Sequence, residues 1–124
     1  MDQEYVPYEI ALELKQLGFD EYCMGACYYE WQNRGKTQIV LHTPDEYDSH
    51  DGVKAPLFQQ AFRFFREEYG LISEIIWMTA LPTHNTFSAR IKSSEKTEYM
   101  KECDTYEGSE LDCLRKLIEL VKNK

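Results

Sequence analysis

The segment APLFQQAFRFFREEYGL, residues 55–71, decides how the rest of the chain is organised. Its apolar residues recur at spacings of three and four, as on a helix with one buried face: Leu57, Phe58, Ala61, Phe62, Phe64, Phe65 and Tyr69. Pro56 suits the first turn of a helix, where its missing amide costs nothing, and Gly70 suits the left-handed residue that ends one. The segment predicts a buried central helix against which a sheet is laid.

Two further helices flank this one. Residues 7–17 repeat the pattern on a smaller scale, and Gly18 ends them with Phe19 placed to contact Leu14 in a Schellman motif. A third helix is predicted at 105–122, with the threonine at its start as the N-cap.

Segments rich in β-branched and aromatic residues separate these helices. They predict strands at 22–31, 37–43, 72–80 and 86–92, with a weaker fifth at 98–103. In the fourth strand, Phe87, Ala89 and Ile91 would face the core, while Ser88, Arg90 and Lys92 would face outward. Gly25 weakens the first strand and suggests a bulge.

The order is therefore α-β-β-α-β-β-(β)-α. Short turns between strands indicate an antiparallel sheet with helices packed on one face, an α+β fold. The length of 124 residues predicts one domain, 1–124, in which the polar loop 44–54 is the only candidate seam. Helix, glycine stop and hairpin occur twice, which is a weak sign of duplication.

Residues 55–124 alone give α-β-β-(β)-α, which resembles the topology of the double-stranded-RNA-binding domain. That family binds phosphates with a lysine cluster at the start of its final helix. The matching stretch here is Glu107-Gly108-Ser109-Glu110, which would repel phosphate. The resemblance implies the architecture without the RNA binding.

The net charge of −8 is concentrated in one half of the chain. Residues 1–54 carry about −7 and residues 55–124 about −1. Such acidity repels nucleic acid and anionic lipid and attracts a basic protein, so neither nucleic acid nor membrane is an expected partner. The alternative is that it serves solubility alone. The sequence shows neither a secretion signal nor a membrane span, which predicts a cytoplasmic location.

Candidate metal ligands have simpler explanations. The spacing of Cys23, Cys27, Cys103 and Cys113 fits a zinc site poorly, and small buried thiols are the favoured interpretation. The loop at 42–51 holds hard-cation ligands: His42, Asp45, Asp48, His50 and Asp51, together with Glu46. It lacks the register of an EF-hand, so a solvated acidic loop is favoured. No cofactor is predicted.

Catalytic motifs are also missing from the sequence. It contains no nucleophile elbow, Walker loop, dinucleotide-binding glycine motif or zinc-protease motif. A non-catalytic protein is therefore the expectation.

Aromatic residues exceed what the predicted core needs. The excess comprises Tyr5, Tyr8, Tyr22, Tyr28, Tyr29, Trp31, Tyr47, Trp77, Tyr99 and Tyr106. The candidate binding residues are three of these aromatic residues together with four cationic residues: Tyr28, Tyr29, Trp31, Arg63, Arg66, Arg90 and Lys92. The alternative is that the tyrosines rim the sheet with their hydroxyl groups in water.

Sequence runs along all three helices resemble a family of small uncharacterised proteins of bacterial viruses, prophages and mobile elements. The runs are 5–12 with 17–19; 55–57, 59–63 and 65–67; and 106–107, 110–111, 113–114 and 117–118. Gly108 and Leu111 depart from the family pattern, which leaves open a later start for the last helix. The resemblance implies a viral accessory protein acting in the host cytoplasm and implies no reaction.

Three functions follow as hypotheses. The preferred one is a binding protein that engages a host or viral protein, with self-association at a sheet edge as a further expectation. The second is a small-molecule binder, such as a sponge for a nucleotide signal. The third is a small metal-dependent hydrolase that uses the loop 42–51.

Overall fold

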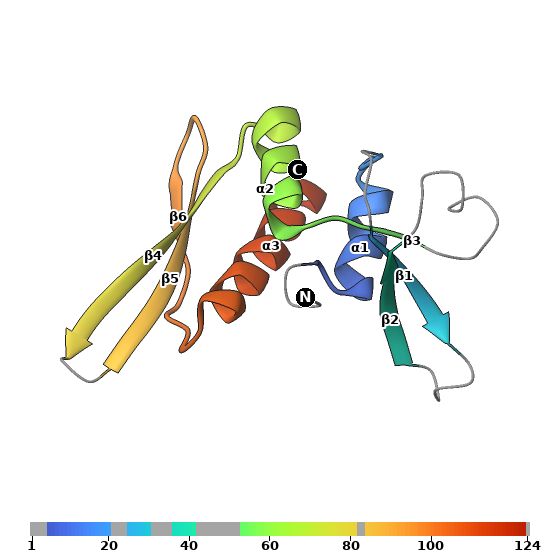
Figure 1. Ribbon diagram of the computed structural model, residues 1–124. Helices are drawn as coiled ribbons and strands as arrows, with labels where there is room; N and C mark the ends of the chain where they lie inside the picture. The colour runs from blue at the N-terminus through green and yellow to red at the C-terminus, as the bar shows by residue number, and fades with distance from the viewer. Residues whose placement is uncertain (1–4, 21–24, 31–35, 42–52, 82–83, 124) are drawn as a thin grey trace. The chain divides into compact units, whose positions relative to one another are not determined.

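The computed structural model describes residues 5–20, 25–30, 36–41, 53–81 and 84–123. The chain divides into two compact units, residues 1–61 and 62–124. Helices and antiparallel strands build both, which confirms the α+β class. The described strands form two three-stranded sheets where a single sheet was predicted (Figure 1). The single domain stays a prediction, and the boundary between the units falls inside a helix. No helix in the described ranges is long and apolar enough to cross a membrane.

The first helix of the N-terminal unit, α1, spans Tyr8–Gln16. Gly18 follows it with a φ of +98°, the left-handed conformation that glycine adopts without strain. The Gly18 amide donates to the Lys15 carbonyl at 3.1 Å, and the Phe19 amide donates to the Leu14 carbonyl at 3.0 Å. These are the two bonds of a Schellman motif, so the predicted helix stop is confirmed.

The sheet of this unit has the order β2-β1-β3, formed by Gly25–Glu30 (β1), Lys36–Leu41 (β2) and Val53–Ala55 (β3). The hairpin β1-β2 confirms the two predicted strands over the residues that the structure describes, and Gly25 pairs with both neighbours in regular register. The short strand β3 lies at the end of the predicted polar loop. Three residues carry too little alternation to indicate a strand, and pairing with β1 creates it. The helix α1 packs on β3 and β1.

The phenylalanine-rich segment forms α2, Phe58–Tyr69. It begins two residues after Pro56, and the Gln60 side chain accepts the Leu57 amide at 3.1 Å, as half of a capping box does. Gly70 ends the helix with a φ of +66°, as predicted. The sheets make their main helix contacts with α1 and α3 and not with α2, so the expectation of a sheet laid against this helix is not met. The predicted burial is confirmed, since the four phenylalanines of α2 are all buried: Phe58, Phe62, Phe64 and Phe65.

The sheet of the C-terminal unit has the order β4-β5-β6, with Ile72–Leu81 as β4, His84–Lys92 as β5 and Thr97–Tyr99 as β6. The strand β6 confirms the weak fifth strand, although it starts and ends earlier than predicted. Beyond it, the chain stays beside β5, because Phe87 and Cys103 exchange backbone hydrogen bonds of 2.8 and 2.7 Å. His84, which lies between the predicted third and fourth strands, already belongs to β5.

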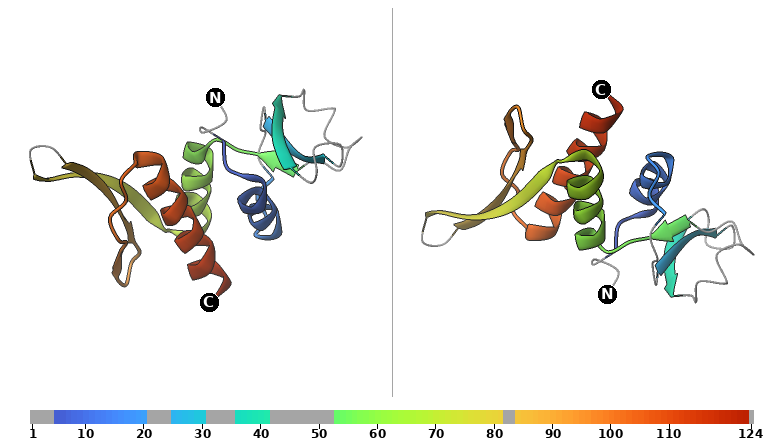
Figure 2. Two further views of the ribbon diagram at one scale, coloured as in Figure 1. Left: turned by 90° about the horizontal axis from the view of Figure 1, so that it is seen from below. Right: turned by 90° about the horizontal axis from the view of Figure 1, so that it is seen from above.

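The last helix, α3, spans Tyr106–Lys122 and packs on β5 and β4. The Thr105 hydroxyl accepts the Gly108 amide at 3.0 Å, which confirms the predicted N-cap and places the helix start directly after it. α2 and α3 lie on the same side of the sheet (Figures 1 and 2). The buried side chains that α3 and β5 contribute are mostly apolar: Cys113, Leu114, Leu117, Ile118, Ala89 and Ile91.

The twofold pattern of helix, glycine and hairpin is present in the backbone, since Gly18 and Gly70 both have positive φ. The third strands differ, however. In the N-terminal unit the third strand pairs with the first, and in the C-terminal unit it pairs with the second. The two sheets are therefore not equivalent. The element order α2-β4-β5-β6-α3 is the one predicted, and its likeness to the double-stranded-RNA-binding domain stays a prediction.

Candidate functional site

The outer edge of β4 is a long strand edge with little protection. Among the described strands β4 pairs only with β5, so its other edge offers backbone N–H and C=O groups to a further strand. Natural edges are blunted by lysine, proline, bulges or inward charges. The ten residues of β4 include no lysine or proline, and Glu74 is their only charge. Their register shift lies at the far end, between Thr79 and Leu81.

Large apolar side chains are exposed along the same strand. Trp77 is 64% exposed, Ile72 47% and Met78 39%. The other large apolar residues that are exposed in the described part of the chain are Leu57, Tyr99 and Tyr106. Half of this group thus lies on a single strand, which marks β4 as a candidate interaction element.

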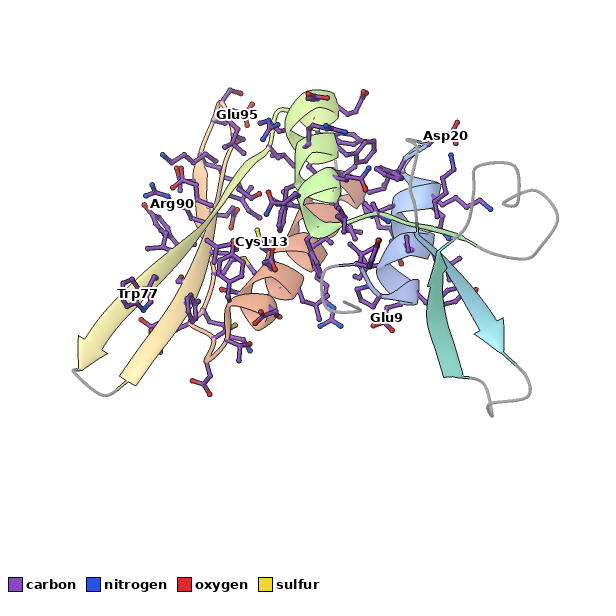
Figure 3. The ribbon with its side chains drawn as sticks, viewed as in Figure 1. Glu9, Asp20, Trp77, Arg90, Glu95 and Cys113 are labelled. Carbon is purple, nitrogen blue, oxygen red and sulfur yellow. The ribbon has the colours of Figure 1, made fainter. Side chains whose placement is uncertain are left out.

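The register with β5 assigns these side chains to the two faces of the sheet. Cross-strand partners share a face, so Ile72 and Met78 lie with Glu74, Arg90 and Lys92 on one face. Figure 3 shows Arg90 directed away from α3, and Cys113 between the sheet and the helices. This face is therefore the one that α2 and α3 leave uncovered.

Trp77 belongs to the opposite, helix-facing side. It pairs with Phe87, whose ring meets the ring of Tyr106 edge to face at 5.8 Å between centroids. Apolar side chains consequently border the β4 edge on both faces, and a strand added there would contact both sets.

The single charge on β4 is already neutralised within the sheet. Arg90 donates to one Glu74 carboxylate oxygen through Nε at 2.9 Å and Nη2 at 2.6 Å. Lys92 lies 3.5 Å from the other oxygen. The hydrogen bond from Arg90 is the main cause that lowers the pKa of Glu74. A strand that approaches β4 therefore meets apolar surface and backbone groups more than net charge.

The two cysteines whose side chains are described, Cys103 and Cys113, do not have the character of nucleophiles. Burial raises the pKa of Cys113 to about 12. The Cys103 thiol donates to an Asp112 carboxylate oxygen at 3.1 Å, and this bond is the main cause that raises the pKa of Cys103. Both thiols are protonated at neutral pH, whereas thiol chemistry needs the thiolate. Cys113 is the small buried thiol that the sequence favoured.

A buried carboxyl group lies near the start of α3. Glu110 is only 7% exposed, and burial, followed by the nearby charge of Glu107, raises its pKa to about 7. The sequence pattern missed this feature because Glu110 resembles an ordinary acidic residue in the first turns of a helix.

The predicted binding residues lie in different places. Arg90 and Lys92 share the uncovered face beside Glu74, while Arg63 and Arg66 are exposed on α2, on the other side of the sheet. These four cations do not form one cluster. Tyr28 and Tyr29 belong to β1, but their side chains lie outside the described part, as does the whole of Trp31.

The predicted metal ligands cannot be placed. His42, Asp45, Asp48, His50 and Asp51 lie outside the described residues, together with Glu46 and the side chains of Cys23 and Cys27. Within the ranges that are described, no group of three or more His, Cys, Asp or Glu side chains could hold a metal ion.

Comparison with known proteins found no matching family model, no matching curated protein and no matching solved structure. The functional argument therefore starts from the fold and the β4 edge.

Proposed function

We propose that this chain is a non-catalytic binding protein that pairs an extended segment of a protein partner with the outer edge of β4. The observation that carries the proposal is the combination on one strand of three exposed large apolar side chains with an edge that pairs with no other described strand. Strand addition is a general mode of peptide recognition, in which the backbone supplies affinity and alternate side chains supply specificity.

The energetics favour this mode over charge-driven binding. Each added backbone hydrogen bond contributes about 0.5–1.5 kcal/mol net, and burial of the Trp77 side chain contributes more than any single bond of this kind. Trp is also the residue type most enriched among interface hot spots. Because Arg90 and Lys92 are engaged with Glu74, the contacts made at this edge, and hence the dissociation rate, should depend weakly on salt.

The other hypotheses have less support. A nucleotide binder that uses Arg63, Arg66, Arg90 and Lys92 together would need these side chains on one surface, and they lie on opposite sides of the sheet. A hydrolase centred on the loop 42–51 would rest on residues outside the described part.

The biological setting belongs to the same proposal. The resemblance along the three helices supports an accessory protein of a bacterial virus or mobile element that engages a host protein in the cytoplasm. The net charge of −8 favours a basic partner, because long-range attraction would accelerate the encounter before β4 makes its contacts.

Site-specific cross-linking tests the proposal. A photoreactive phenylalanine analogue replaces Trp77 in one variant and Tyr99 in a control. Tyr99 is an aromatic residue on the opposite edge strand and, at 74% exposed, is somewhat more accessible than Trp77. We expect cross-linking in host cells from position 77 and not from position 99. The purified partner should then protect β4 amides from hydrogen exchange.

The result also identifies the kind of partner. A cross-link to a different protein with protected β4 amides supports the proposal as stated, and a cross-link to a second copy shows that the edge pairs with itself. Cross-linking from position 99 alone, or a partner that leaves the β4 amides unprotected, would refute binding at this edge.

A further inference from the structure

A cavity of about 480 Å³ lies in the C-terminal unit, away from the sheet face described above. Three parts of the chain meet around it: the end of α2 with Gly70 and Leu71, the turn between β5 and β6, and the end of α3. Its volume falls within the range of small-molecule sites. Figure 3 shows Glu95 at the tip of the β5–β6 turn.

The lining of the cavity has an excess of negative charge. It includes Glu95 and Glu98, whereas Lys96 is the only cation among the described residues that line it and binds Glu98 at 2.9 Å. Tyr69, Leu120 and Asn123 place the C-terminal ends of two helices at the same cavity. A helix C-terminus carries roughly half a negative charge.

Local cations reduce this excess. The hydrogen bond with Glu98, and after it the charge of Glu95, raises the pKa of Lys96. The hydrogen bond with Lys96, and after it the charge of Lys116, lowers the pKa of Glu98. Arg66 and Lys122 lie in the last turns of α2 and α3, and neither they nor Lys116 are among the described residues that line the cavity. The β5–β6 turn offers few donors to an anion, because the Glu95 and Lys96 amides both donate to the Ser93 hydroxyl.

The remaining wall is apolar and aromatic. Leu71, Ile91 and Leu120 line it together with Tyr69. An aliphatic or aryl chain fits such a wall. The lining as a whole therefore suits a molecule with an apolar body and a positively charged head.

We infer that this cavity binds an organic cation, an alkylammonium or guanidinium group whose head lies toward Glu95 and whose apolar chain packs on Leu71, Ile91 and Leu120. The source of the group is either a free amine or the lysine or arginine side chain of a bound protein. This inference does not rest on the proposed function of the β4 edge, so the failure of one proposal would not affect the other.

Amide chemical shifts of the full chain provide the test. The probes are hexylammonium, hexanoate and hexanol, which share one apolar chain and differ in charge. We expect saturable shifts at Leu71, residues 93–98 and Asn123, with hexylammonium bound about tenfold more tightly than hexanoate. Equal binding of the three probes, tighter binding of hexanoate, or no saturable shift at these residues would overturn the inference.

Charge variants sharpen the result. Glu95→Gln keeps the Lys96–Glu98 pair and should weaken hexylammonium several-fold, by about the effect of one nearby charge. The double variant Glu95→Gln, Glu98→Gln leaves Lys96 as the only charged side chain among the described lining residues, so the preference should reverse toward hexanoate. Glu67→Gln with Glu102→Gln removes two exposed carboxylates outside the lining and should change neither affinity. An unchanged preference in the double variant would contradict the assignment.

A peptide distinguishes the two sources of the cation. If acetyl-Gly-Lys-Gly-amide shifts the same amides as strongly as hexylammonium does, the cavity accepts a side chain of a bound protein. If only hexylammonium binds, the cavity is a site for a free amine. Both results support a cation site, and the failure of both ligands would refute it.

Discussion

The most unusual single residue in the described chain is Glu110, a carboxylic acid in the buried face of α3. Its pKa of about 7 lies above the ordinary value of 4.5. The folded state therefore holds a proton that the unfolded state releases near pH 4.5. The resulting stabilisation is complete below that pH and is lost as the pH rises through about 7.

Replacement of Glu110 by Gln should remove this pH dependence. We expect E110Q to gain roughly 2 kcal/mol relative to the wild type between pH 5 and pH 8, because the amide never ionises. Urea unfolding of both proteins at the two pH values measures the difference. E102Q is the control, since Glu102 is exposed, and it should show no such gain. A constant difference between E110Q and the wild type across this range would contradict a buried protonated carboxyl.

At a second residue, Gly108, the N-cap hydrogen bond and the helix propensity have opposing effects of similar size on stability. A Cβ added there would lie 2.9 Å from the Thr105 hydroxyl oxygen, the atom that accepts the Gly108 amide. Alanine within a helix is about 1 kcal/mol better than glycine, and loss of an N-cap costs a similar amount. We therefore expect Gly108→Ala to leave the free energy of unfolding nearly unchanged.

The same substitution in a Thr105→Ala background should stabilise by about 1 kcal/mol, because no cap remains to be displaced. A double-mutant cycle measured by thermal or urea unfolding gives the coupling between the two positions. Additive effects would show that the hydroxyl moves aside at no cost.

At the scale of elements, the helix stops are local and testable. Gly70 adopts a φ of +66° with nothing within 4 Å of an added Cβ, so any cost of substitution comes from the backbone alone. We expect Gly70→Ala to cost about 1–2 kcal/mol of unfolding free energy and Gly70→Asn distinctly less, because asparagine tolerates this conformation. Equal losses for both variants would show that packing, and not backbone conformation, sets the cost.

These same elements show what the sequence could predict. Helix periodicity, Gly18, Gly70 and the Thr105 cap act within a few residues, so all three helices followed from local pattern. The strand β3 was missed because a distant strand creates it. The exposed apolar side chains at the outer edge of β4 were missed for the same reason. The run Ile76-Trp77-Met78 predicts only a strand, and the exposure of this edge depends on the pairing of β6 with β5 instead of β4. The aromatic excess was the available signal, since Trp77, Tyr99 and Tyr106 prove exposed.

At the scale of the whole molecule, α2 is the element that the two units share. The boundary between the units falls after Ala61, so this one helix contributes Phe58 to the first unit and Phe64 and Phe65 to the second. Each buried phenylalanine contributes about 1.5–3 kcal/mol, a large part of the 5–15 kcal/mol by which a domain is stable. A C-terminal fragment that keeps α2 should therefore be more stable than one that begins after this helix.

Residues 55–124 retain α2 and the complete sheet and helix of the C-terminal unit, so we expect this fragment to fold with a cooperative thermal transition. Residues 70–124 keep β4, β5, β6 and α3 but lose Phe64 and Phe65, and this fragment should lack a cooperative transition. Circular dichroism and amide proton dispersion distinguish the two states. A third fragment, 55–124 with Phe65→Ala, tests the cause directly, because removal of one fully buried ring should cost about 3–5 kcal/mol. If residues 70–124 fold as well as residues 55–124, the phenylalanine-rich helix is not the spine of this unit.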